Sequence, residues 1–363
     1  HHTQKLYETE AEAGLACLSA GMDVELPDTV CFNEEMKAMF AQGKADMALL
    51  DQEVRRVLRA KFRMGLFEHP FALTGSALSE MVHHPEDELI TLQSALESLV
   101  LLKNDNHVLP VGKNVRKIAL IGPHADNVRH FFGGYTHLSM VEAIHAVMNS
   151  LAGVDASNTE RKPMLTVPGT QVQSDETEEF AQIGRQIKPD CPSLLAKLTS
   201  SLPDAEITYA YGYPIAGADE SHFAEALQAA AGADLVILTL GGKHGSGSVA
   251  TMGEGVDATD INLPRCQDAF IRAAANLHKP MIGIHFGGRP ISSDAADECL
   301  DAILEAWNPS EMGAEALTRV LTGETAPSGR MPVTTARSAG QIPVYYNHPN
   351  GSSWHQGDSI GFQ

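Results

Sequence analysis

LVILTLGGKHGSGSVATMGEGVDATDINLP, residues 235–264, is the stretch that decides the fold. Its first six residues form an apolar and β-branched run, which predicts a strand buried on both faces of a parallel sheet. The chain then breaks into a long loop rich in Gly and Ser, in which Glu254 lies between Gly253 and Gly255. Ligands of open α/β sheets bind beyond the carboxyl ends of the strands, so this loop is in a position to form a site.

The carboxylic acid of Glu254 has two interpretations on local sequence. Neither glycine neighbour carries a side chain, so the acid can approach a ligand closely. Asp257 and Asp260 follow within six residues. The alternative is a solvated acidic loop whose glycines serve only turns, since loop acids are common on protein surfaces. Local sequence leaves both open.

Apolar runs and helical patterns alternate over the rest of this region. Strands are predicted at 118–121, 207–211, 235–240, 281–286 and 302–307. Helices are predicted at 141–150, 223–231, 265–277 and 312–321. This alternation predicts an α/β fold with a mostly parallel sheet sandwiched by helices and right-handed crossovers. Residues 86–102, just before it, have the periodicity of a helix.

The first part of the chain has a different pattern. A helix at 8–20 and a short strand at 22–27 resemble the closing unit of a larger α/β domain, because alone they cannot bury their apolar faces. Helices at 33–42 and 51–64 follow, the second with Asp51 as N-cap, and residues 68–79 have linker composition. The chain lacks an initiator Met and a signal segment, so we expect it to be part of a longer gene product and predict no compartment.

Composition excludes several classes of function. The formal net charge of −20 over 363 residues argues against sequence-independent nucleic-acid binding. No apolar run approaches the roughly 18 residues of a membrane span, so no membrane partner is predicted. The five cysteines have no CxxC spacing and predict neither a disulfide framework nor a zinc site. We therefore expect no cofactor and no metal.

Familiar catalytic and nucleotide-binding motifs are also missing. No G-x-G-x-x-G follows a strand, and G-x-x-x-x-G-K-[ST] is absent, which argues against a nucleotide site. Without G-x-S-x-G, a serine hydrolase of the α/β type is not indicated. Five histidines in this region have no spacing typical of a triad: His124, His130, His137, His244 and His285.

A second loop of interest, FFGGYTH at 131–137, follows the first strand of the sheet. It should therefore lie at the same edge as the Glu254 loop. An aromatic ring after two glycines, here Tyr135, could stack on the apolar face of a sugar. The alternative is that Tyr135 only packs its own loop.

Segments in order along nearly the whole chain resemble glycoside hydrolase family three, the β-glucosidase and β-xylosidase family. The end of its barrel domain and its interdomain segment resemble AGMDVELP at 20–27, VRRVLRAKFRMGLFEHPF at 54–71 and ESLVLLKNDNHVLP at 97–110. Its sandwich domain resembles KIALIGPHAD at 117–126, FFGGY at 131–135, GEGVDATDINLP at 253–264, ILEAWNPSEMGAEALTRVLTGETAPSGRMPVT at 303–334 and GQIPVYYNH at 340–348.

The resemblance implies a domain organisation. Residues 1–30 would form the C-terminal end of a (β/α)8-type barrel, namely its closing βα unit, and residues 31–112 a helical interdomain segment and linker. Residues 113–340 would form the α/β sandwich domain carrying the acid/base loop, and 341–363 a C-terminal extension. Absent pieces would leave apolar surface exposed, so we expect the chain to sit against another domain or chain.

The resemblance also implies an activity. Members of the family are retaining glycosidases that cleave a terminal β-linked sugar, and a β-glucosidase acting on non-reducing β-linked glucose fits best. Glu254 matches the family's general acid/base. Tyr135 and Met252 flank the expected cleft and are predicted to contact the substrate, a β-linked oligosaccharide or an aryl or alkyl β-glycoside. Asp257 is expected to shape the loop.

Two departures from the family keep alternatives open. The Ser-Asp-Trp-like nucleophile segment does not occur in this chain, so a missing barrel segment or a partner chain would supply the aspartate. Ala258 stands where the family usually has Arg, which changes the ion pairing expected around the loop. The alternatives are a β-xylosidase or α-arabinofuranosidase on the same scaffold, and a sugar-binding fragment without turnover. Homo-oligomerisation is left open.

Overall fold

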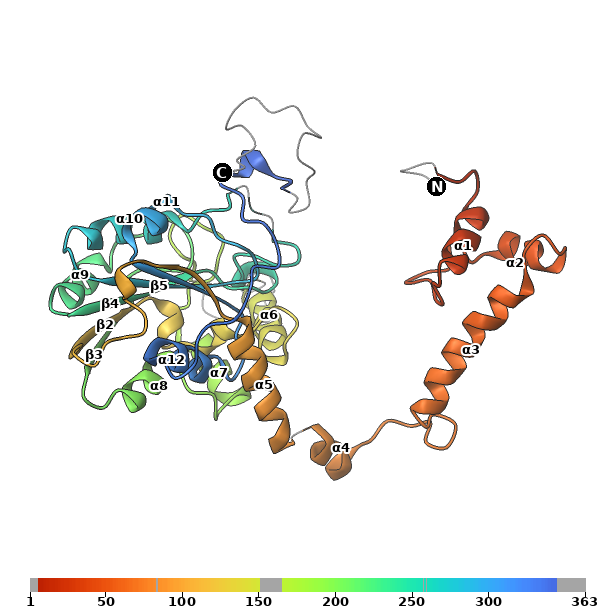
Figure 1. Ribbon diagram of the computed structural model, residues 1–363, viewed down its shortest axis with the longest axis horizontal. Helices are drawn as coiled ribbons and strands as arrows, with labels where there is room; N and C mark the ends of the chain where they lie inside the picture. Colours follow the sequence, from red (N-terminus) through yellow and green to blue (C-terminus); the bar gives the residue numbers. More distant parts are fainter. Residues whose placement is uncertain (1–5, 83, 151–164, 257, 259, 345–363) are drawn as a thin grey trace, which may run out of the picture. The chain divides into compact units, whose positions relative to one another are not determined.

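The structure, a computed structural model, describes residues 6–82, 84–150, 165–256, 258 and 260–344 and divides into two compact units, His1–His84 and Pro85–Gln363 (Figure 1). The helices of the first unit are α1 (Glu10–Ser19), α2 (Glu34–Ala41), α3 (Met47–Arg63) and α4 (Gly75–Val82). Their small core contains Ala11, Leu18 and Met36.

Two local predictions for the first unit are wrong. Residues 22–27 form no strand, because no neighbouring strand in the described part of this unit offers its backbone groups for a ladder. Helix α3 starts earlier than predicted, since Asp46 rather than Asp51 is its N-cap and accepts a 2.9 Å hydrogen bond from the Ala48 N–H. Apolar side chains of α3, including Leu58 and Phe62, are exposed.

The second unit contains the sheet. Its strands are β1 (Val100–Asn104), β2 (Lys117–Ile121), β3 (Glu206–Ala210), β4 (Leu235–Gly241), β5 (Met281–Phe286) and β6 (Ala302–Trp307). Its helices are α5 (Pro85–Ser98), α6 (His137–Ser150), α7 (Glu178–Ile187), α8 (Leu194–Ser201), α9 (Phe223–Ala231), α10 (Arg265–Ala275), α11 (Asp294–Cys299) and α12 (Gly313–Thr322). The predicted mostly parallel sheet with flanking helices is confirmed.

The strand order is β1-β6-β5-β4-β2-β3, with β1 antiparallel to β6 and every other pair parallel. Strand β1 was not predicted, because its apolar residues continue the pattern of the preceding helix; that helix ends at Ser98 instead of at 102. The segment 85–112 thus contributes α5 and β1 to the unit that holds the sheet. The assignment of residues 1–30 to a barrel remains a prediction.

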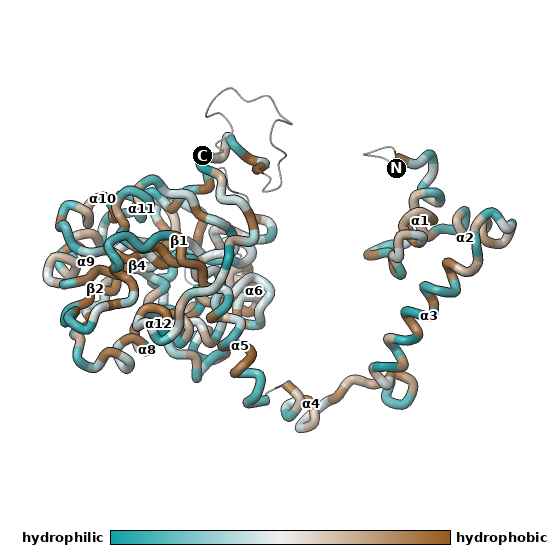
Figure 2. The backbone as a smooth tube through the Cα atoms, viewed as in Figure 1, coloured by the Kyte–Doolittle hydropathy of each residue, from teal (hydrophilic) through white to brown (hydrophobic). Residues whose placement is uncertain are grey.

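Strand β4 is buried at every residue, as its apolar run predicts. It lies between β2 and β5, with Val236 paired to Met281 at one end and Gly241 to Phe286 at the other. In Figure 2 the central strands are among the most strongly hydrophobic segments of the unit. The alternation of side chains along each strand sends successive residues of β4 into two separate cores.

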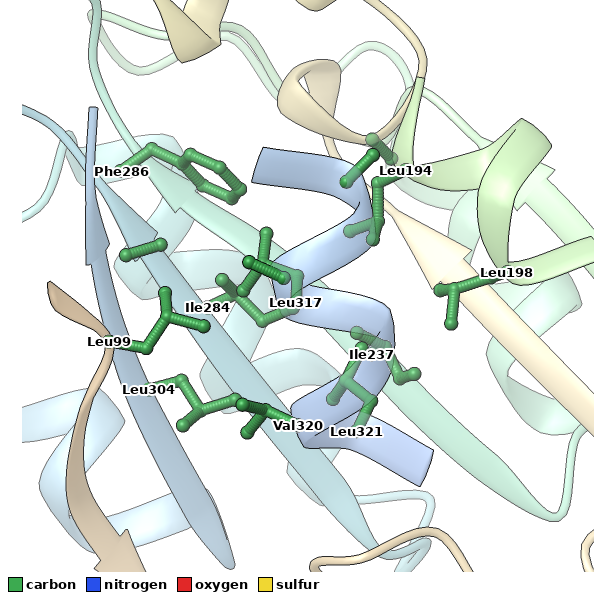
Figure 3. Close-up of a cluster of buried hydrophobic side chains, with 14 of the residues drawn as sticks. Leu99, Leu194, Leu198, Ile237, Ile284, Phe286, Leu304, Leu317, Val320 and Leu321 are labelled. Carbon is green, nitrogen blue, oxygen red and sulfur yellow. The ribbon is translucent and has the colours of Figure 1, made fainter. Parts of the chain in front are cut away.

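Helices cover both faces of the sheet. Ile237 of β4 and Ile284 of β5 face α8 and α12, and Figure 3 shows Leu198 and Leu317 packing toward them. On the other face, Val236, Leu238 and Leu240 pack against α9, α10 and α11. Because helices cover both faces of the sheet, a ligand can bind at the edge where the parallel strands end.

Candidate active site

Two loops meet at the carboxyl edge of the sheet. Residues 122–136 follow β2, and residues 242–264 follow β4. The Gly134 N–H donates a 3.1 Å hydrogen bond to Nδ1 of His244, which joins the two loops. The FFGGY segment and the Glu254 segment therefore lie side by side, at the edge where the sequence predicts both loops.

Glu254 lies at an exposed turn of the second loop. Gly253 and Gly255 both have positive φ, 130° and 69°, a backbone conformation that favours glycine. A short bridge pairs Gly253 with Val256 and closes the turn around Glu254. The glycines are thus required by the turn itself, and the turn leaves the Glu254 side chain exposed to solvent.

Tyr135 contacts Glu254 directly. Its phenolic hydroxyl donates a short hydrogen bond to Oε2 of the Glu254 carboxyl, although the residue as a whole is 75% exposed. This hydrogen bond and the nearby negative charge raise the pKa of Tyr135. The ring does not simply pack its own loop; contact between Tyr135 and a sugar stays a prediction.

Met252 lies beneath the loop and is only 7% exposed. Its Sδ is 3.1 Å from the Gly288 N–H, and a Cβ built on Gly287 would be 2.8 Å from that sulfur. Met252 also lines a cavity of about 430 Å³ together with Gly242 and Arg289. The predicted contact of Met252 with substrate therefore stays a prediction, and the contacts seen are with the loop after β5 and, through a bridge to His244, with its own loop.

The cavity beside Met252 combines apolar walls with a few charged groups. Arg289 is half-buried, burial lowers its pKa, and within the described part of the chain its Nε has no hydrogen-bond partner. Asp260 also lines the cavity, and its carboxyl accepts hydrogen bonds from the backbone and side chain of Asn262. Asp257, which was predicted to shape the loop, lies outside the described residues. Ala258 is exposed.

A buried ionic network, which the sequence analysis missed, lies under the two loops. Arg129 Nε is 2.7 Å from Glu142 Oε1, and both side chains are fully buried. Lys243 Nζ lies 3.7 Å from Glu142 Oε2 and donates hydrogen bonds to the Phe132 carbonyl (2.6 Å) and to Ser139 Oγ (2.7 Å). Burial lowers the pKa of Lys243 to about 8, against the opposing effect of Glu142.

This network has no sequence signature, because its members are distant in the chain. Its one local signal is that Lys243 and His244 directly follow the predicted strand, in the place where α/β proteins carry site residues. Lys243 ties the β4 loop to the carbonyl of Phe132, three residues before Tyr135. The network thereby supports the loop that presents Tyr135 to Glu254.

Two of the histidines without a triad spacing are buried at the same edge. His130 Nε2 is 3.4 Å from Asp175 Oδ2, and Tyr211 donates a 2.7 Å hydrogen bond to the same carboxyl. Burial lowers the pKa of His130 to about 4, although Asp175 opposes the shift. Burial alone would raise the pKa of Asp175, but the hydrogen bond from His130 leads a set of interactions that lower it to about 2. His124 is fully buried beside His130, and burial lowers its pKa well below the usual value.

These shifts predict that acid destabilises the protein. His130 binds a proton at pH 6.5 when unfolded but only near pH 4 when folded, so between these values the unfolded state holds more protons. The contribution of His130 to the free energy of unfolding is therefore fully present above about pH 6.5, and it is lost as the pH drops toward about 4. Asp175, with its depressed pKa, adds a further loss as the pH falls from 3.8 toward 2.

Urea unfolding midpoints measured from about pH 7 to about pH 4 check this expectation. The midpoint should fall across that range in the wild type, and it should fall less in His130→Gln, which lacks the titrating ring. Equal pH dependence in the two proteins would contradict the role given to His130.

The described residues contain no group of three or more His, Cys, Asp or Glu side chains placed to hold a metal ion. Nor does the described part include any helix long and apolar enough to cross a membrane. This edge of the sheet carries the exposed carboxyl of Glu254, bonded to the Tyr135 hydroxyl, and a cavity lined by an arginine and an aspartate.

Residues 99–362 match the model of the glycosyl hydrolase family 3 C-terminal domain. The periplasmic β-glucosidase of Salmonella typhimurium is 31% identical over 344 residues, an alignment covering 93% of this chain and 40% of that protein. A putative β-xylosidase of Formosa agariphila is 30% identical, with 94% of this chain and 38% of that protein covered. A β-glucosidase structure from Erythrobacter marinus aligns with a TM-score of 0.57 at 28% identity, covering 93% of this chain and 41% of that one. The chain thus spans about two fifths of the length of these relatives.

Proposed function

Because this chain belongs to glycosyl hydrolase family 3, we propose that it supplies the general acid/base of a retaining β-glycosidase and that Glu254 is that residue. The observation that carries the proposal is the place of Glu254. It lies at an exposed turn at the carboxyl edge of the sheet, and its carboxyl is held by the hydroxyl of a tyrosine from the neighbouring loop.

The first chemical step uses the protonated carboxyl. Glu254 gives its proton to the oxygen of the leaving group while an aspartate attacks the anomeric carbon from the opposite face of the sugar. The bond from the anomeric carbon to the leaving oxygen breaks, and a covalent glycosyl-enzyme forms. The leaving group departs as a neutral alcohol, and Glu254 becomes a carboxylate.

The second step uses that carboxylate as a base. Glu254 takes a proton from a water molecule, whose oxygen attacks the anomeric carbon and displaces the aspartate. The sugar is released with its β configuration, and Glu254 regains its proton. One residue thus alternates between acid and base, which requires that it reach both the leaving oxygen and the incoming water.

The attacking aspartate lies outside this sequence in our proposal. A barrel segment or a partner chain would carry it, with its carboxyl roughly 5–5.5 Å from that of Glu254, as a retaining site requires. The exposed position of Glu254 is compatible with this arrangement, because the side chain is free to face a second element. Closure of that element over the sugar would exclude water from the reacting groups.

The substrate class we propose is a terminal β-linked glucose. The relatives that this chain is similar to include proteins named β-glucosidase and proteins named β-xylosidase. A β-xylosidase is therefore the second candidate. The two sugars differ in the hydroxymethyl group at C6, which a glucosidase accommodates and a xylosidase does not need.

The test compares aryl β-glucoside with aryl β-xyloside on the full gene product and follows the released sugar by proton NMR. We expect the glucoside to have the higher kcat/KM, and we expect the β anomer to appear first. Preference for the xyloside would show that the substrate is a β-linked xylose, and it would not contradict the role of Glu254. Initial release of the α anomer would contradict the retaining mechanism, and binding of sugar without any turnover would favour a non-catalytic module.

A further inference from the structure

We propose that Tyr135 is the positioning residue of the Glu254 carboxyl: its hydroxyl fixes Oε2 so that Oε1 is left to exchange the proton with substrate and water. This inference rests on the proposed function. Within the described part of the chain, the Tyr135 hydroxyl donates the hydrogen bond that the Glu254 carboxyl accepts. A carboxyl on an exposed turn otherwise rotates freely, and a proton donor works only when it is held within reach of its target.

The tyrosine is itself held by contacts between the two loops. Before Tyr135, the Phe132 carbonyl accepts a 2.6 Å hydrogen bond from buried Lys243, and the Gly134 N–H is bonded to His244. After it, Thr136 Oγ1 closes the turn by donating a 2.8 Å hydrogen bond to the Gly133 carbonyl. The backbone on both sides of Tyr135 is therefore fixed, although its ring is exposed.

Three glycines bring the two loops into backbone contact. A Cβ built on Gly134 would lie 3.2 Å from the Cα of Gly245, and one built on Gly253 would lie 2.0 Å from the Gly245 carbonyl oxygen. The peptide of Gly245 thus lies against the residue before Tyr135 and against the residue before Glu254. This close approach sets the phenol and the carboxyl next to each other and gives the hydrogen bond its geometry.

The hydrogen bond has a consequence for the chemistry. A carboxyl that is no longer held by a hydroxyl can turn away from the leaving oxygen, so fewer bound substrates meet the acid in a productive geometry. Replacing Tyr135 with Phe removes that hydroxyl and keeps the ring. The rate of the step that needs the acid should therefore fall, while KM should change little.

The experiment measures kcat and KM on the full gene product for wild type, Tyr135→Phe, Tyr209→Phe and Glu254→Gln. Tyr209, a half-buried residue of β3, is the control, because the same substitution there removes a tyrosine hydroxyl other than the one that is bonded to the Glu254 carboxyl. For Tyr135→Phe we expect roughly a tenfold lower kcat on a substrate with a poor leaving group, a small part of the 10²–10⁴ typical of acid–base catalysis. The kcat/KM of a dinitrophenyl glucoside, whose leaving group needs no acid, should change little.

The outcomes separate this inference from the proposed function. If Glu254→Gln loses activity but Tyr135→Phe keeps the wild-type kcat on the substrate with a poor leaving group, Tyr135 is not a positioning residue. A raised KM in Tyr135→Phe with an unchanged kcat would likewise overturn the inference and make Tyr135 a sugar contact. Full activity in Glu254→Gln would overturn both proposals.

A second readout does not depend on turnover. The phenol of Tyr135, isolated as the ultraviolet difference between wild type and Tyr135→Phe, should titrate above the usual range of tyrosine, because Glu254 raises its pKa. In the Glu254→Gln background the same phenol should titrate lower. An unchanged titration would mean that the two groups do not interact in solution and would overturn the inference.

Discussion

Replacing Glu254 with Gln is expected to lower kcat on an aryl β-glucoside with a poor leaving group by roughly 10²–10⁴-fold. Glutamine has nearly the same size and can still accept the hydrogen bond from Tyr135, but it has no proton to give. The loss in kcat/KM, which reports on the first step, should shrink as the leaving group improves, because a good leaving group departs without protonation. A kinetic series of aryl glucosides on the full gene product measures this dependence.

Glu206→Gln is the control for that series. Glu206 is an exposed glutamate at the start of β3, and its strand ends at the edge where Glu254 lies, so Glu206 is at the opposite edge of the sheet. Its replacement should leave every rate near that of the wild type. If Glu254→Gln and wild type turn over the substrate with the poorest leaving group at the same rate, Glu254 is not the general acid of the reaction.

Removing Glu142 is expected to cause the largest loss of stability, about 3–5 kcal/mol of unfolding free energy. Glu142 faces both Arg129 and Lys243 inside the protein, and all three side chains are at most 1% exposed. Glu142→Gln keeps the shape but leaves two buried cations without their counter-ion. Urea unfolding monitored by circular dichroism measures the change in midpoint at constant slope.

A surface pair provides the comparison. Arg185 and Glu178 form a 2.9 Å ion pair of the same chemistry, with side chains 63% and 79% exposed. Because solvent screens this pair, Glu178→Gln should cost only about 0–1 kcal/mol. A cost for Glu142→Gln that is no larger than this control would contradict the view that the network supports the two loops.

The sheet was predictable because the physics of its strands is local. A strand buried on both faces must be apolar throughout, and β4 follows this rule at every position, so its run was visible in the sequence. Strand β1 was not visible, since the apolar residues of 100–104 are continuous with those of α5. Conversely, residues 22–27 have the composition of a strand, but a strand also needs a partner, which composition does not reveal.

The site was predictable only in part, for a related reason. Because both loops follow parallel strands, the sequence predicts that Tyr135 and Glu254 lie at the same edge of the sheet. The hydrogen bond between them was not predicted, because it depends on how closely the loop backbones approach at Gly245. The charges of Arg129 and Glu142 resemble surface residues in the sequence, and only the fold reveals that they are buried.

The most direct test of the central claim is the product that Glu254→Ala forms with a dinitrophenyl β-glucoside in the presence of azide. The substrate can form the glycosyl-enzyme without an acid, but water attacks it slowly once the base is gone. Azide needs no base and fits the space left by the carboxyl, so we predict faster turnover and β-glucosyl azide as the product. Formation of α-glucosyl azide would make Glu254 the nucleophile, and turnover equal to wild type without any response to azide would remove Glu254 from the reaction.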